Sequence, residues 1–236
     1  MRTDQERIPT YGGSNDVIQQ TCPRCGKSPD THKPFPRINT GEDSERLLEQ
    51  FRNSLDDLSE ATIKSNNLRE AYLKLATGAG GTVYSTSMMG AAVATIGSKV
   101  MGYVALSGPG PAVFSKWIKR NKMPKDTVII EVTNTLVSGK LLDISLKQFT
   151  PIAPVAQGRG RDYPLGSCAA QKLLHRILAD AVAANQKVTA IEFCEMFWQD
   201  FGAEGHNRDW STGQIVQSCD TCKQVIPQML CSNTDD

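Results

Sequence analysis

Apolar residues recur at intervals of three and four between Asp43 and Ala76, which predicts an amphipathic helical segment. We expect Asp43 or Ser44 to cap its start, and the pair Asn66-Asn67 to divide it into two helices. The first apolar stripe packs on the domain and consists of Leu47, Leu48, Phe51, Leu55 and Leu58.

The pattern changes after the glycines at 78, 80 and 81, where β-branched and small apolar residues predict strands. We expect strands over residues 82–87, 91–96 and 100–106, with Gly97-Ser98 forming a hairpin turn before the last of these. A further β-branched run, residues 127–132, predicts another strand. The Pro- and Gly-rich residues 150–166 predict a loop.

A helical pattern returns at Cys168 and continues to about Ala184. The pattern of residues 188–193 then predicts a buried strand that extends toward Trp198. Cys219 is expected to open a last short helix running through Val225, which Pro227 bends or ends. The last five of these elements follow the order strand, strand, helix, strand and helix, which is typical of an α/β domain.

Composition suits a folded α/β protein. The chain has 236 residues, of which 39% are hydrophobic and 22% charged, with a formal net charge of +1. This balance excludes a dedicated nucleic-acid coat but allows a local basic patch. No apolar run reaches the roughly 20 residues that span a bilayer, and no signal-peptide core is evident. We expect a cytoplasmic or nuclear protein, or a fragment of an exported toxin.

These observations predict three regions. Residues 1–40 are rich in Pro and Gly and are expected to be irregular, residues 41–80 form a helical N-terminal extension, and residues 81–236 form the main domain.

Seven cysteines include two CxxC pairs, which favour metal binding or redox chemistry when no secretory signal is present. The first pair, Cys22 and Cys25, resembles a zinc knuckle, with His32 nearby. A structural zinc site needs four ligands and this segment offers three. A loop with two free thiols, or with a local disulfide, therefore remains an equal alternative.

The second pair, Cys219 and Cys222, is expected at the start of a helix, and so is Cys168. A helix N-terminus favours thiolate over thiol, and residues three apart share one face of a helix. A CxxC pair together with a third cysteine that opens a separate helix therefore favours a metal site. Three unrelated buried thiols are the alternative.

The segments Gly166–Lys172 and Ser218–Lys223 together resemble the metal site of the zinc-dependent cytidine-deaminase-like superfamily. The entry from Tyr163 to Ala169 is similar to that of toxin-type bacterial deaminases. The resemblance implies a three-layer α/β/α fold with a mixed sheet, and zinc held by Cys168, Cys219 and Cys222. It also implies hydrolytic removal of an amino group from a nucleobase, with cytosine favoured over adenine.

One residue departs from this family. The superfamily places a proton-carrying Glu two positions after the first ligand, and this chain has Ala170 there. The resemblance therefore implies a catalyst that is inactive or nearly so. Ala170 is either a substitution in an active enzyme, which the intact ligand set favours, or the mark of a natural non-catalytic relative. Gln171 cannot exchange protons as a carboxylate does.

Basic residues near Trp117, among them Lys119 and Arg120, suit a nucleic-acid backbone and a stacked base. Loops beyond the third strand bring Trp198, His206 and Trp210 as further substrate-binding candidates. The alternatives are a solvated charged face and ordinary core packing. We expect a nucleic-acid or nucleotide substrate and no membrane; a free nucleoside, or a zinc-stabilised binding module without activity, are the alternatives.

Overall fold

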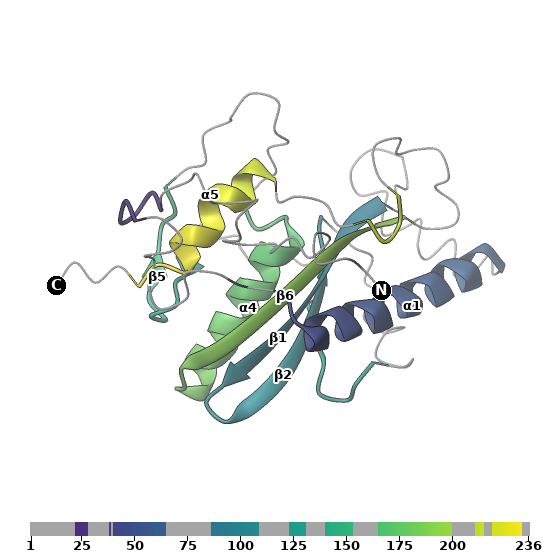
Figure 1. Ribbon diagram of the computed structural model, residues 1–236, viewed down its shortest axis with the longest axis horizontal. Coiled ribbons are helices and arrows are strands. Elements are labelled where there is room, and N and C mark those ends of the chain that lie inside the picture. Colours follow the sequence, from purple (N-terminus) through teal and green to yellow (C-terminus); the bar gives the residue numbers. More distant parts are fainter. Residues whose placement is uncertain are drawn as a thin grey trace.

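The computed structural model describes residues 22–27, 38, 40–64, 86–108, 123–130, 140–152, 165–199, 211–214 and 219–232. Within these residues the chain is a mixed α/β structure, as expected, in which three helices pack around a mixed sheet (Figure 1).

The sheet is built on one long hairpin. Strand β1 (Thr86–Ile96) pairs antiparallel with β2 (Lys99–Leu106), and Gly97 in the turn between them has φ +60°, which suits glycine. Strand β6 (Val188–Gln199) pairs antiparallel with β1, while the short β3 (Val128–Ile129) pairs parallel with β2. The order β3-β2-β1-β6 is therefore a mixed sheet.

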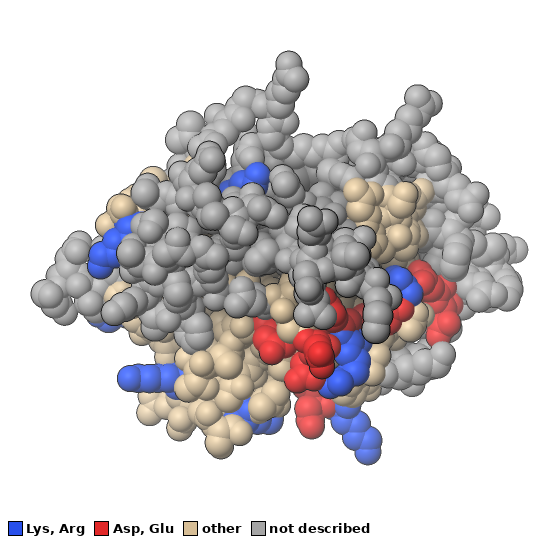
Figure 2. Space-filling view, viewed as in Figure 1, with Lys and Arg blue, Asp and Glu red and all other residues tan. Residues whose placement is uncertain are grey.

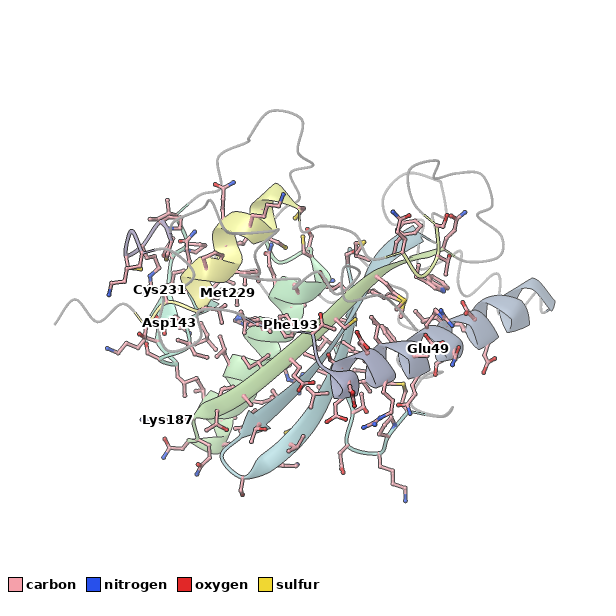
Figure 3. The ribbon with its side chains drawn as sticks, in the orientation of Figure 1. Glu49, Asp143, Lys187, Phe193, Met229 and Cys231 are labelled. Carbon is pink, nitrogen blue, oxygen red and sulfur yellow. The ribbon has the colours of Figure 1, made fainter. Side chains whose placement is uncertain are left out.

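Helix α4 (Ala169–Ala184) covers one face of this sheet, and α5 (Asp220–Met229) packs beside α4. Alternate strand residues, such as Ala92 on β1 and Phe193 on β6 (labelled in Figure 3), enter the same buried cluster as Leu173 of α4. Gly90 lets the helix approach closely, since a Cβ there would lie 2.9 Å from a methyl carbon of Leu173.

Helix α1 (Glu42–Lys64) covers the opposite face, where its apolar stripe forms a second cluster with residues such as Met89 and Cys194. The predicted stripe is confirmed, and α1 shares its core with the sheet. The helix begins at Glu42, before the predicted caps, and the Ser44 hydroxyl accepts a hydrogen bond from the Gly41 N–H. The predicted second helix, near residues 68–76, lies outside the described residues.

The outer face of α1 is charged in both signs. Arg46 pairs with Asp43, and Arg52 pairs with Glu49 and Asp56. Figure 2 shows acidic and basic side chains gathered side by side in this region. A mixed face of this kind is typical of a solvated helix surface rather than a phosphate-binding patch.

The strand and turn predictions hold with four differences. β1 is a single strand that joins residues 86–87 of the first expected strand to the second one at 91–96, and residues 82–85 lie outside the described residues. Of the expected strand over 127–132, β3 covers only Val128–Ile129 among the described residues 127–130. Helix α5 contains Pro227 and continues to Met229, so the proline does not end the helix. The small pair β4 (Leu141–Leu142) and β5 (Gln148–Phe149) was not predicted.

Among the described helices, none has the length and apolar character needed to cross a lipid bilayer.

Candidate metal centre

Three cysteines from two helix starts meet at one point. Cys168 is the N-cap residue of α4, Cys219 is the N-cap residue of α5, and Cys222 lies in the first turn of α5. Their sulfur atoms all lie within 4.8 Å of one another, and the Sγ atoms of Cys168 and Cys219 are 3.4 Å apart. A tetrahedral zinc ion with Zn–S bonds of about 2.3 Å places its sulfurs about 3.8 Å apart. The cluster therefore has the dimensions of a zinc site.

The three thiols share protons unequally. The pKa of Cys219 is lowered to about 3, because the thiols of Cys168 and Cys222 and the backbone N–H groups of Thr221 and Cys222 donate hydrogen bonds to its sulfur. The pKa values of Cys168 and Cys222 are raised by that same sharing and by burial. A bound cation favours deprotonation of all three thiols.

Gln171 orients the cluster from α4. Its Oε1 accepts a hydrogen bond of 2.7 Å from the Gly166 N–H, and its Nε2 donates to the Cys222 Sγ over 3.3 Å. Gly166 has φ +79°, a backbone conformation that favours glycine. This fully buried amide links the loop before α4 to the start of α5. A donor to a ligating sulfur is a usual outer-shell partner of a metal, and sequence reasoning assigned Gln171 no such role.

A carboxylate stands at the start of α4, although position 170 is alanine. Glu195 on β6 is only 5% exposed, and its Oε1 accepts a hydrogen bond of 3.0 Å from the Ala170 N–H. Its negative charge is one of the causes that raise the pKa of Cys168. The signal in the sequence was a Glu among apolar strand residues. Glu195 lies two residues after Phe193 on the strand and therefore on the same face, toward α4.

Glu195 caps a helix whose own N-cap side chain makes no capping bond. We expect Glu195→Ala to lower the free energy of unfolding by about 2 kcal/mol, because the buried Ala170 N–H loses its acceptor. Glu195→Gln retains an oxygen acceptor and is expected to lose less than half as much. Chemical denaturation of both variants measures this; equal losses would show that the hydrogen bond to Ala170 does not stabilise the helix.

Lys172 is a second buried charge beside the cluster. Its Nζ donates to the carbonyls of Leu106 and Gly108, over 2.9 and 2.8 Å, and so ties α4 to the end of β2. Burial lowers the pKa of Lys172 to about 8, and negative charge on the nearby Cys168 sulfur opposes that shift. The lysine places positive charge near a site that would collect three thiolates.

The structure separates Trp198 from the cysteines. Its side chain is buried in the cluster beneath α1, and its Nε1 donates a hydrogen bond of 2.8 Å to the Asp56 carboxylate. Trp198 thus lies on the face of the sheet that is opposite to α4. The other predicted substrate-binding residues, Trp117, Lys119, Arg120, His206 and Trp210, lie outside the described residues.

This placement predicts a purely structural role for Trp198. Trp198→Phe removes the bond to Asp56 and is expected to lower the free energy of unfolding by about 2 kcal/mol, as for a hydrogen bond to a charged group. Zinc content and substrate affinity are expected to stay unchanged. A variant of native stability with weakened substrate binding would contradict this assignment.

The chain matches no family model, no curated protein and no solved structure. Two cysteine triads among the described residues can hold a metal ion, Cys168 with Cys219 and Cys222, and Cys22 with Cys25 and Cys231.

Proposed function

We propose that Cys168, Cys219 and Cys222 hold a catalytic-type zinc ion in a deaminase fold that acts on the amino group of a nucleobase. The observation that carries the proposal is the meeting of three thiols at two helix starts, within 4.8 Å of one another. Three protein ligands leave a fourth position open for water, as in catalytic zinc sites. The order of elements and the helices on both faces of a mixed sheet agree with the resemblance drawn from the sequence.

Hydrolytic deamination places demands on the residues around such a site. Water adds to C4 of cytosine or C6 of adenine, ammonia leaves, and a proton moves first to the ring nitrogen and then to the leaving amine. Zinc supplies a water ligand whose pKa is lowered toward about 7. The three cysteines hold the ion, and Gln171 fixes the position of Cys222. The proton transfers require a carboxylate, which Ala170 cannot provide.

The proposed substrate is a base in a nucleic acid, with cytosine favoured, and this chain is expected to turn it over little or not at all. A zinc-loaded Ala170→Glu variant tests the reaction on nucleosides, single-stranded DNA, RNA and duplexes, with release of ammonia and base conversion as readouts. Conversion of the base in one of these four kinds of substrate identifies the class of substrate on which the enzyme acts. A zinc-loaded, folded variant that converts none of them contradicts the enzyme assignment.

A zinc-stabilised module without activity is the second candidate, favoured by one observation. Ala170 is completely buried in the apolar cluster around α4, and the carboxylate beside it already caps the helix. In this case zinc serves to hold α4 and α5 together, and the substitution Ala170→Glu would lower stability without producing activity.

A further inference from the structure

The second cluster of thiols joins the two ends of the described chain. Cys22 and Cys25 lie in the turn over residues 22–27, and Cys231 follows the end of α5. The three sulfur atoms lie within 4.8 Å of one another, although Cys231 belongs to no motif in the sequence. Cys22 and Cys231 are each only 2% exposed, and none of the three forms a disulfide.

The turn that carries Cys22 and Cys25 has the local geometry of a metal-binding knuckle. The Gly26 N–H donates to the Cys22 carbonyl over 2.8 Å, and the Cys22 N–H donates to the Lys27 carbonyl over 2.9 Å. Gly26 has φ +67°, while a Cβ there would meet nothing within 4 Å, so the backbone angle rather than space requires glycine.

This geometry repeats that of the first triad. Backbone N–H groups two and three residues after Cys22, those of Arg24 and Cys25, donate to its sulfur. At Cys219 the N–H groups two and three residues later do the same. Burial nevertheless raises the pKa of Cys22. The Cys22 thiol donates to the Pro227 carbonyl over 3.7 Å.

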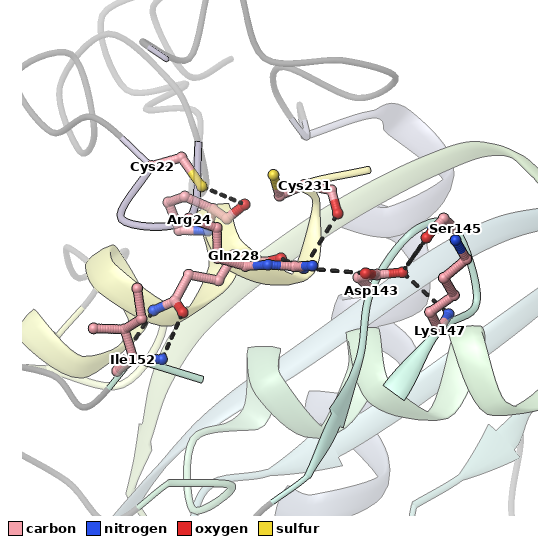
Figure 4. Close-up of polar contacts among 9 residues, drawn as sticks. Cys22, Arg24, Asp143, Ser145, Lys147, Ile152, Gln228 and Cys231 are labelled. Atoms are coloured by element: carbon pink, nitrogen blue, oxygen red, sulfur yellow. Dashed lines mark hydrogen bonds and ion pairs between the residues drawn. The ribbon is translucent and has the colours of Figure 1, made fainter. Parts of the chain in front are cut away.

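Arg24 fixes the turn against its surroundings (Figure 4). Its Nη1 donates to the Gln228 carbonyl over 3.0 Å and to the Asp143 carboxylate over 3.1 Å, with a longer contact of 3.4 Å to the Cys231 carbonyl. The guanidinium also lies 4.3 Å from the centre of the Phe149 ring. The turn is thereby held to the end of α5 and to the β4–β5 pair, and a positive charge stands at the edge of the cluster.

The Asp143 carboxylate is itself held in place. Its Oδ1 accepts hydrogen bonds from the N–H groups of Ser145 and Lys147 and from the Ser145 hydroxyl. Asp143 is 1% exposed, so its pairing with Arg24 is shielded from water. Figure 3 shows Asp143 beside Cys231 and Met229, and Met229 is the last residue of α5, whose N-cap residue is Cys219. Several polar contacts therefore surround the second triad, as in an outer shell of a metal.

We propose that Cys22, Cys25 and Cys231 bind a second zinc ion, which anchors the C-terminal end of α5 to the N-terminal turn. Three thiolates supply three of the four ligands of a tetrahedral ion, and the described residues bring no fourth Cys, His, Asp or Glu into this cluster. Helix α5 carries Cys219 and Cys222 at its opposite end. The second ion thus holds these two residues in position against Cys168.

Zinc stoichiometry of purified variants tests the proposal. We expect about two zinc ions per chain in the wild type and about one in Cys231→Ser. The triple variant Cys168→Ser/Cys219→Ser/Cys222→Ser is also expected to keep one. Cys194→Ala is the matched control, because it removes a buried thiol that belongs to neither triad, and it is expected to keep both ions.

The outcomes separate the two sites. A wild type with one ion and a triple variant with none would overturn the second site and leave the proposed function intact. Two ions in Cys231→Ser would also overturn it. A triple variant that keeps one ion, and loses it when Cys231→Ser is added, supports it even if the first site fails. The anchoring role predicts that Cys231→Ser weakens zinc binding at the first site by about tenfold, the lower end of outer-shell effects.

Thiol labelling of the wild type tests the same site if a variant does not fold. We expect Cys22, Cys25 and Cys231 to resist alkylation until a chelator removes zinc, as judged by mass spectrometry of peptides. Protection that a chelator does not change, or a disulfide between any two of the three in reduced preparations, would overturn the proposal.

Discussion

Ala170→Glu is expected to raise the rate of base deamination by about 10²–10⁴-fold, the range that general acid–base catalysis supplies. The gain should lie near the top of this range, because one carboxylate carries a proton in two successive steps. Ala170→Gln is the matched control, since it adds a side chain of similar size that cannot exchange protons. Its activity is expected to equal that of the unaltered chain. Equal rates in the two variants would contradict the proton-carrying role.

Ala170→Glu is also expected to lower the stability of the protein. The Ala170 side chain is fully buried, and the Glu195 carboxylate already accepts from the Ala170 N–H. Two carboxylates held this close repel each other, so the variant is expected to unfold at lower temperature than the unaltered chain. Adding Glu195→Gln removes one of the two charges and is expected to restore part of the loss. Thermal unfolding of the single and double variants measures both effects.

Cys222→Ser is expected to abolish zinc binding at the first triad and to remove the stability that the ion provides. A ligand present at 100 to 1,000 times its dissociation constant stabilises the native state by about 2.7 to 4.1 kcal/mol. Cys222 is 2% exposed and also accepts a hydrogen bond from Gln171. A serine at this buried position replaces a soft thiolate ligand with a hard hydroxyl, which binds zinc poorly. Cys194→Ala is again the control that keeps the ion.

Unfolding measured with excess zinc and with a chelator separates the two contributions. The chelator should lower the stability of the unaltered chain. It should have little effect on the stability of Cys222→Ser, apart from any contribution that comes from zinc at the second triad. A Cys222→Ser protein whose zinc content and zinc-dependent stability match the unaltered chain would show that these cysteines are not ligands.

Much of the site could be predicted because its determinants are local. Cys168 and Cys219 precede strongly patterned helices, and the spacing of Cys219 and Cys222 places both at one helix start whatever the rest of the fold does. The hairpin turn at Gly97 and the stripe on α1 follow from local patterns in the same way.

The remaining features depend on contacts between distant segments. Nothing in the residues around Cys231 indicates that they meet Cys22, because that contact needs α5 to lie against the N-terminal turn. Glu195 reaches Ala170 only because β6 pairs with β1 beneath α4. Trp198 was placed with the substrate loops on its position in the chain, yet alternation along β6 turns it toward α1. A one-residue shift in strand position decides which face a side chain occupies.

X-ray absorption at the zinc edge tests the central claim most directly, when it is measured on the unaltered chain and on Cys231→Ser. In Cys231→Ser the remaining ion should show three sulfur neighbours at about 2.3 Å and one oxygen or nitrogen neighbour at about 2.0–2.1 Å. That shell would identify three cysteine ligands with an open fourth position. A protein without zinc, a shell with fewer than two sulfurs, or a closed shell of four sulfurs would contradict a catalytic-type centre at Cys168, Cys219 and Cys222.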